Sequence, residues 1–138
     1  MIIENPTTPL TEIFDPLFSN KQLRVFIKRE DLTDKFISGN KFYKLKYNLI
    51  EAEKFGHSTV LTFGGAFSNH IHATAAAGNK YGLKTIGVIR GEEHLPLNPT
   101  LSSAQENGMT LEYLNRKSYR NKYDEVLINK YKDKFGDF

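Results

Sequence analysis

Cysteine is missing from this chain of 138 residues. Its absence excludes a disulfide scaffold, a thiolate metal site and a cysteine nucleophile. Long apolar runs are missing as well: none approaches the ~20 residues that a membrane-spanning helix needs, and the first residues lack the basic and apolar regions of a secretory signal. We therefore expect a cytoplasmic protein without a membrane partner.

A strong excess of one charge is also absent. Lysine and arginine together number 19 against 16 aspartate and glutamate residues, a formal net charge of +3. The two signs are interleaved through most of the chain, which gives no support to nucleic-acid binding. With 39% apolar and 25% charged residues, the composition is that of one soluble domain. At this length, folding buries roughly two-thirds of the surface of the unfolded chain.

Strands and helices alternate from residue 41 onward. Apolar residues at helical spacing from Phe42 to Phe55 predict a helix that Gly56 can close. The further expected elements are strands over 59–63, 83–89 and 109–114 and helices over 69–81, 100–106 and 119–135. Such alternation predicts a parallel sheet between two layers of helices, an open three-layer α/β fold.

The first 40 residues do not show this alternation of strands and helices. Pro6, Pro9 and Pro16 are expected to break any helix there, and residues 23–28 alternate like a strand. At the other end, only residues 136–138 follow the last expected helix, where the rhythm calls for another strand. We therefore expect an irregular N-terminal segment and a final β-α-β unit that stays unfinished.

Residues 64–68 are the first candidate site. Gly64 and Gly65 follow a strand and precede a helix that Ser68 or Asn69 can cap. Free N–H groups and the positive end of the helix dipole meet at such a position and favour a phosphate or a carboxylate. The alternative is that the glycines make only a tight turn and Ser68 is only a cap. The pattern leaves both interpretations open.

Lys41 is the second candidate. It follows Ser38, Gly39 and Asn40 at a helix start, where a cation is disfavoured. That field, together with burial, is expected to lower the pKa of its ammonium group and to yield the neutral amine that Schiff-base formation requires. The alternative is an ordinary solvated lysine.

The four histidines give no metal site. His70 and His72 are two residues apart and point in different directions on a helix, so they cannot hold one ion jointly. His57 and His94 fall in expected loops. We therefore expect no metal ion.

Four segments, in their order and spacing, resemble the family of 1-aminocyclopropane-1-carboxylate (ACC) deaminases and D-cysteine desulfhydrases. These are pyridoxal-phosphate (PLP) enzymes with the tryptophan synthase β-like fold. The segments are residues 5–10 (NPTTPL), 27–32 (IKREDL), 38–47 (SGNKFYKLKY) and 63–70 (FGGAFSNH). The resemblance implies that residues 1–40 belong to the large cofactor domain and that residues 41–138 form the small α/β domain. Because such relatives are much longer, it implies an N-terminal portion of the fold, truncated and inactive alone.

The resemblance also implies residue roles. Lys41 would form the Schiff base with PLP, and Lys44, one turn on, would contact its phosphate. Asn69 would bond the 3′-oxygen of the pyridine ring. The substrate carboxylate would be held by Ser68, Asn69 and His70, with Ser68 among the catalytic residues. Phe67 and His72 depart from the glutamine and the arginine of many relatives, which alters the wall around that carboxylate.

The implied activity is a deaminase or lyase reaction on a small amino acid, in a full-length protein that is a homodimer. ACC would be opened to 2-oxobutyrate and ammonia, whereas D-cysteine would yield pyruvate, ammonia and sulfide. The resemblance does not choose between these substrates.

Two other interpretations stay open. One is a dinucleotide-binding fragment in which Arg90 meets a 2′-phosphate, although adjacent glycines do not fit the Gly-x-Gly-x-x-Gly pattern. The other is a non-catalytic α/β module that binds a partner through an open sheet edge. A visible absorption band of bound PLP would distinguish the PLP enzyme from both of these interpretations.

Overall fold

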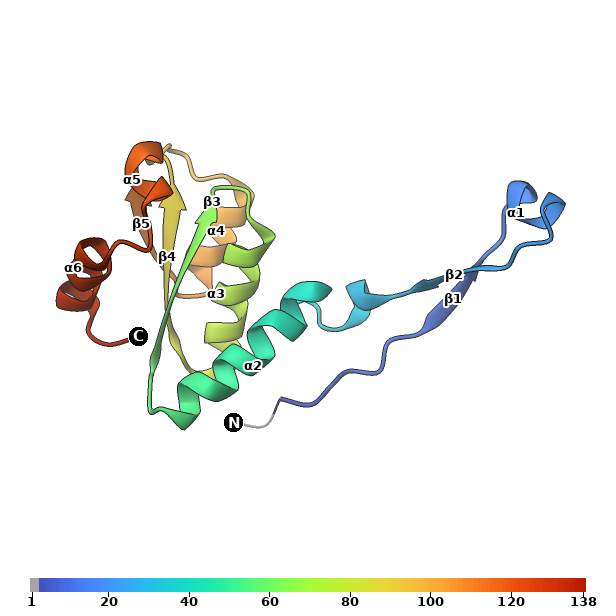
Figure 1. Ribbon diagram of the computed structural model, residues 1–138, viewed down its shortest axis with the longest axis horizontal. Coiled ribbons are helices and arrows are strands. Elements are labelled where there is room, and N and C mark those ends of the chain that lie inside the picture. Colours follow the sequence, from blue (N-terminus) through green and yellow to red (C-terminus); the bar gives the residue numbers. More distant parts are fainter. Residues whose placement is uncertain (1–2) are drawn as a thin grey trace.

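A computed structural model describes residues 3–138. Figure 1 shows a layered α/β part and a long hairpin that projects away from it. We call residues 9–29 the arm and residues 40–138 the body. The arm contains β1 (Leu10–Ile13), α1 (Pro16–Asn20) and β2 (Val25–Lys28), and a short 3₁₀ helix (Glu30–Leu32) follows it. The two strands pair antiparallel, with Leu10 opposite Lys28 and Ile13 opposite Val25.

The body is built on a parallel sheet with the strand order β3-β4-β5. Its strands are β3 (Thr59–Gly65), β4 (Lys84–Arg90) and β5 (Thr110–Leu114). Its helices are α2 (Asn40–Lys54), α3 (Asn69–Tyr81), α4 (Pro99–Glu106), α5 (Arg116–Arg120) and α6 (Glu125–Phe135). The sheet register places Thr59 opposite Lys84 and Ile86 opposite Thr110.

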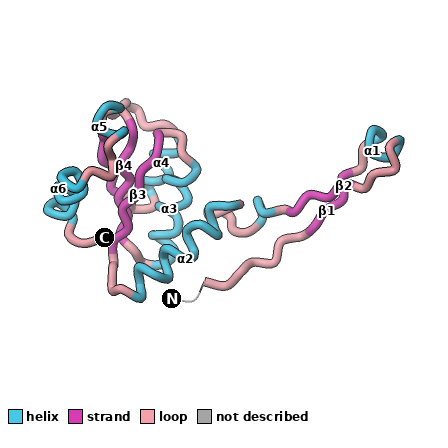
Figure 2. Tube along the Cα trace, in the orientation of Figure 1, coloured by secondary structure: helices cyan, strands magenta, loops and turns pink. Residues whose placement is uncertain are grey.

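Helices cover both faces of this sheet. Figures 1 and 2 show α3 and α4 on one face and α5 and α6 on the other. On the second face the ring of Phe63 makes edge-on contacts with Tyr119 and Tyr131, at centroid distances of 6.0 and 6.5 Å. The predicted three-layer arrangement is therefore confirmed.

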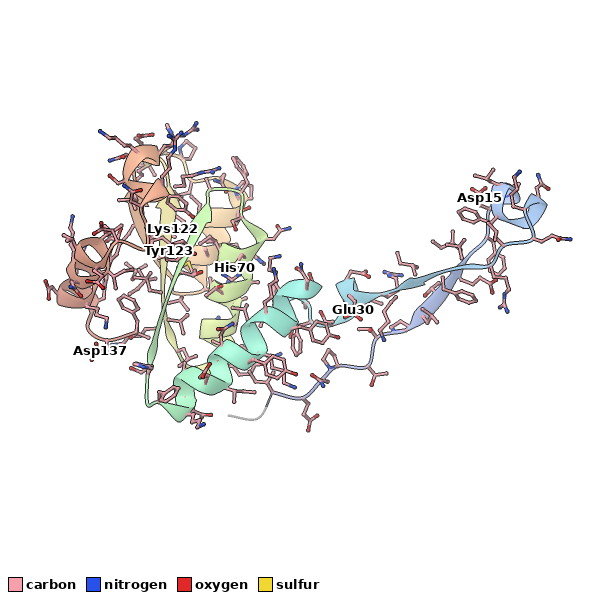
Figure 3. All side chains as sticks on the ribbon, in the orientation of Figure 1. Asp15, Glu30, His70, Lys122, Tyr123 and Asp137 are labelled. Atoms are coloured by element: carbon pink, nitrogen blue, oxygen red, sulfur yellow. The ribbon has the colours of Figure 1, made fainter. Side chains whose placement is uncertain are left out.

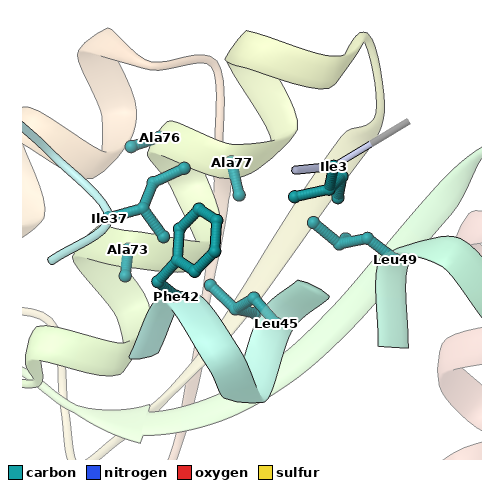
Figure 4. Close-up of a cluster of buried hydrophobic side chains, with 8 residues drawn as sticks. All are labelled: Ile3, Ile37, Phe42, Leu45, Leu49, Ala73, Ala76 and Ala77. Carbon is teal, nitrogen blue, oxygen red and sulfur yellow. The ribbon is translucent and has the colours of Figure 1, made fainter. Parts of the chain in front are cut away.

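Two apolar clusters hold the body together. The first joins α2 and α3 to the segments that precede α2, as Figure 4 shows, and its members are Ile3, Ile37, Phe42, Leu45, Leu49, Ala73, Ala76 and Ala77. The second lies between α3, the sheet and α4, and its members are Ile71, Ala75, Ile89, Leu101, Ala104 and Met109. Small alanines on α3 serve both clusters, so this helix can lie close to its neighbours on two sides.

The ends of α3 agree with the prediction. Ser68 caps its first turn, and Gly82 ends it in the left-handed region with φ 72°. Helix α2 runs from Asn40 to Lys54, and the left-handed Gly56 (φ 76°) follows it as expected.

Two predictions about helices are wrong. Pro16 does not break a helix but opens α1, because a first-turn position needs no backbone N–H and Asp15 caps the helix before it. The single helix expected over 119–135 is divided into α5 and α6. Asp124 causes the division: its carboxylate accepts the Val126 N–H at 2.9 Å and starts a new helix.

Candidate functional site

The start of α2 presents Lys41. Gly39, just before the helix, has φ 64° and ψ −147°, a conformation open to glycine but not to residues with a side chain. The helix therefore starts at Asn40 and places the half-buried Lys41 in its first turn. The Lys41 Nζ donates a hydrogen bond to Asn40 Oδ1 at 2.7 Å.

An open groove joins this helix start to α3. Its volume is about 380 Å³. Lys41 and Asn69, predicted as site residues from separate segments, both line it, and so does His72. The remaining lining residues are Asp31, Lys35, Phe36, Ser38, Gly39, Asn40 and Ala73. The packing of α2 against α3 thus brings together two of the predicted site residues.

His70 lies within the field of both predicted lysines. Its Nε2 is 2.8 Å from Thr62 Oγ1, on β3. Burial lowers the pKa of this imidazole, and the positive charges of Lys41 and Lys44 lower it further. His70, labelled in Figure 3, lies in the first turn of α3. His70 is therefore mainly neutral at pH 7, and the charges of two lysines act on it.

Ser68 is a helix cap in this structure. Its Oγ accepts the N–H groups of His70 at 3.2 Å and of Ile71 at 3.4 Å. Its side chain is half-buried, but it is not among the residues that line the groove of Lys41. The first turn of α3 nevertheless carries Ser68, Asn69 and His70 together at the positive end of the helix dipole.

The adjacent glycines have a different role from the predicted one. Gly64 and Gly65 are not a loop or a tight turn but the last residues of β3, with φ outside the left-handed region. A Cβ atom on Gly64 would lie 2.4 Å from Ile71 Cγ1. Glycine is therefore needed because α3 packs directly on the strand. The connection from β3 to α3 is therefore only residues 66–68, and it contains no glycine for the dinucleotide interpretation.

The remaining candidates lie apart from the groove. Arg90 ends β4, and its guanidinium carbon lies 6.0 Å from the ring centroid of Tyr119. His57 and His94 lie in loops, as predicted. Across residues 3–138, no three or more His, Cys, Asp or Glu side chains gather as a metal site would require. In the same range, no helix has the length and apolar content for crossing a membrane.

Several residues of the site were not predicted. Thr62 contacts His70 from the neighbouring strand, and Asp31, Lys35 and Phe36 form the side of the groove opposite α3. Glu30, in the charged run of residues 28–31, is half-buried, and its Oε1 accepts the Thr8 hydroxyl at 3.1 Å. In the sequence, the one feature that could have pointed to Thr62 is that it is a polar residue within the mainly apolar strand β3.

No protein-family model matches the chain. A Thermotoga maritima protein, provisionally named a 1-aminocyclopropane-1-carboxylate deaminase, is 49% identical over 69 residues, which are 50% of this chain and 22% of that protein. The crystal structure of an ACC deaminase homologue has a TM-score of 0.72 and 33% identity over 92% of this chain. A hydrogen sulfide-producing enzyme from Fusobacterium nucleatum has a TM-score of 0.65 and 18% identity over 90% of this chain.

These comparisons confirm the resemblance to ACC deaminases. They also confirm the predicted fold class, a partial open parallel sheet of the tryptophan synthase β-like fold. The chain spans 39% of the ACC deaminase homologue and 40% of the Fusobacterium enzyme. Shares of this size fit an N-terminal portion of such proteins.

Proposed function

We propose that this chain is the N-terminal portion of a PLP-dependent deaminase or lyase that acts on a small amino acid, with Lys41 as the lysine that forms the Schiff base. The observation that carries the proposal is the groove shared by Lys41 and Asn69. The resemblance to ACC deaminases implies that both residues contact the cofactor, and the packing of α2 on α3 brings them to one groove.

The side chains at this surface fit the chemistry of PLP. Lys41 offers an amine for the aldehyde, and Asn69 offers an amide for the ring oxygen. Lys44, which does not line the groove but lies one turn further along α2, offers a second cation for the phosphate. When bound, PLP supplies an electron sink that weakens bonds at the α-carbon of an amino acid. His70, which burial and the two lysines keep neutral, adds no further positive charge to this surface.

The first turn of α3 is the proposed place for the substrate carboxylate. Ser68, Asn69 and His70 lie there with the positive end of the helix dipole, which favours an anion. ACC and D-cysteine both carry such a carboxylate on a small skeleton, and either fits this part of the proposal. The exposed Phe67 stands next to this turn, where many relatives are expected to carry a glutamine.

The arm supports the predicted division of the chain. None of residues 9–32 is buried, and Phe14 and Leu17 are 85% and 63% exposed. Such a surface is consistent with the proposal that residues 1–40 join a large cofactor domain of a longer protein and that residues 41–138 are the small domain. Ile3 and Ile37 differ from the arm in this respect, because they pack on α2 and α3. We also propose that the longer protein is a cytoplasmic homodimer, and that the 138 residues alone do not turn over an amino acid.

The competing function is a non-catalytic module that binds through the open edge of β3. In the sheet of residues 3–138, β3 has β4 as a neighbour on one side only. An edge of this kind can pair with another strand. It does not account for Lys41 at the start of α2 and Asn69 at the start of α3 on one groove, which is why the enzyme is the better supported proposal.

Covalent labelling tests the assignment of Lys41. A chimera would join this chain to the remainder of the ACC deaminase homologue, and it would be incubated with PLP, reduced with borohydride and mapped by peptide mass spectrometry. We expect the pyridoxyl group on Lys41, and its loss in Lys41→Ala. Lys54→Ala, in the last turn of the same helix, is the matched control that keeps the attachment residue. Label on Lys44 or Lys46 in the parent chimera would overturn the assignment.

A further inference from the structure

Thr33 is a buried residue that the proposed chemistry does not use. Its side chain is 9% exposed. The hydroxyl donates to the Glu30 carbonyl oxygen at 2.9 Å and accepts the Gly39 N–H at 3.0 Å. The same N–H is 2.7 Å from the Glu30 carbonyl oxygen. A small hydrogen-bond network thus crosses the loop that leads to α2, and it consists of Thr33, Glu30 and Gly39.

Gly39 needs such support more than other residues of this loop. Its φ of 64° with ψ of −147° lies in a sparsely populated region, and a residue persists there only where its surroundings fix it. Asp34 fixes the middle of the loop, because its Oδ1 accepts the N–H groups of Phe36 at 2.8 Å and Ile37 at 3.0 Å. Thr33 supplies the corresponding contact at the end of the loop.

The start of α2 depends on Gly39. No side chain caps this helix; instead the Phe42 N–H donates to the Gly39 carbonyl oxygen at 3.1 Å. Lys41 lies between these two residues, so the orientation of the Gly39 peptide sets the direction in which the Lys41 side chain projects from the helix. Figure 3 shows Glu30 where the arm meets the body, close to the start of α2.

We infer that Thr33 is a positioning residue for Lys41: its hydroxyl fixes Gly39, and Gly39 fixes the helix start that directs the lysine into the groove. The inference rests on the proposed function only for the role of Lys41 in catalysis. The placement of Lys41 by Thr33 can be measured on the 138-residue chain without PLP.

Two NMR readouts follow the two steps. Amide hydrogen exchange at Gly39 reports the bond from Thr33. The pKa of His70 responds to the position of Lys41 as well: burial is the largest cause of its lowering, and the charge of Lys41 is the next, followed by that of Lys44. In Thr33→Val the Gly39 N–H keeps its 2.7 Å bond to the Glu30 carbonyl oxygen and loses the 3.0 Å bond to Thr33. We therefore expect Gly39 exchange to be roughly threefold faster, less than the effect of a fully lost hydrogen bond, and the pKa of His70 to move up towards its ordinary value.

Thr33→Ser restores the hydroxyl and is expected to restore both readouts. Thr59→Val is the matched control, since Thr59 is similarly buried (7% exposed) at the far end of β3, and it should leave both unchanged. If Thr33→Val does not fold, Gly39→Ala tests the second step through the backbone alone, because no atom lies within 4 Å of the added Cβ. It should raise the pKa of His70.

Two results would overturn the inference. One is Gly39 exchange that is the same in Thr33→Val and the parent chain. The other is a pKa of His70 that stays unchanged while Gly39 exchange accelerates, or that stays unchanged in Gly39→Ala, which would make Thr33 a purely structural residue. Failure of the proposed function gives a different result, namely pyridoxyl label away from Lys41 in the chimera.

Discussion

The arm and the body are stabilised in different ways. In the body, Ile71, Val88 and Ile89 are at most 1% exposed. In the arm no residue is buried, and apolar side chains such as Phe14 and Ile27 face outward. The body therefore has a core of its own, whereas the arm has only local contacts.

Those local contacts are specific but weak. Arg24 binds Glu12 across the hairpin through two 2.8 Å hydrogen bonds, and Asp15 caps α1. Exposed ion pairs contribute little to stability, and an isolated two-stranded hairpin is marginal in water. Because none of residues 9–29 is buried, we expect the candidate site to keep its order without the arm.

Replacing isoleucine by alanine should change the free energy of unfolding by very different amounts in the two regions. Ile71→Ala removes a fully buried side chain between β3, α3 and their neighbours, and we expect a loss of ~3 kcal/mol in the free energy of unfolding. Ile27→Ala makes the same change in the arm, where the side chain is 46% exposed, and should cost less than ~1 kcal/mol. Urea denaturation measures both. Similar losses would contradict the division into a packed body and an uncovered arm.

Helix caps give a second pair of matched changes. Ser68→Ala in the chimera should reduce turnover at least tenfold, an increase of ~1.4 kcal/mol in the barrier, because Ser68 is a proposed substrate contact. Asp15→Ala removes the cap of α1 in the arm, where Asp15 Oδ1 accepts the Leu17 N–H at 2.8 Å. Each change should also cost about 1 kcal/mol of stability at most.

Release of keto acid from ACC and from D-cysteine would be measured for both cap variants. A Ser68→Ala chimera that melts earlier but turns over normally would show that Ser68 is only a cap. Loss of turnover in Asp15→Ala would show that the arm contributes to the site.

The ion pair that ties Asp34, in the segment between arm and body, to Lys80 of the body differs in pH dependence from the ion pair of the arm. Burial alone raises the pKa of Asp34, but the hydrogen bonds from Lys80 (2.6 Å) and from the N–H groups of Phe36 and Ile37 outweigh it, so the pKa is lowered. A lowered carboxyl pKa gives stability that is present above the unfolded value and is lost as the pH falls through the folded value. Asp34→Asn should therefore cost ~1 kcal/mol at pH 7 and nearly nothing at pH 2.

The matched change in the arm is Glu12→Gln. The hydrogen bond with Arg24 lowers the pKa of Glu12 too, but this pair is exposed to solvent, with 72% of the Arg24 side chain accessible. We expect a smaller change in the urea midpoint than for Asp34→Asn. An equal pH dependence of the two variants would contradict this ranking.

The sequence predicted the body better than the arm, for physical reasons. Helical spacing and the left-handed Gly82 are local signals, and they predicted α3 from Asn69 to Tyr81 as the structure has it. The errors arose where a local signal has two meanings. Pro16 can break a helix or open one, and an amphipathic pattern can continue across a new cap at Asp124.

The candidate site shows the same limit. Lys41 and Asn69 could be named as separate candidates, and the groove between them could not, because it depends on how α2 packs on α3. The need for glycine at position 64 was visible only once Ile71 was placed against β3. The Thr33 hydroxyl gave no signal, since a single threonine in a loop has no pattern.

The smallest expected effect is that of removing the arm. The Arg29 N–H donates to the Pro9 carbonyl oxygen at 3.0 Å, so the base of the hairpin is already closed. Residues 10–28 can therefore be replaced by Asn-Gly, a two-residue turn that suits such a hairpin. Because no replaced residue is buried, we expect the free energy of unfolding of the 138-residue chain to change by less than ~0.5 kcal/mol. The pKa of His70 and the exchange rate of the Gly39 amide should stay the same.

A large loss of stability would mean that the body depends on the arm. If stability holds, and the same replacement abolishes folding of the chimera with the ACC deaminase homologue, then the exposed apolar side chains of the arm serve contacts beyond residues 40–138.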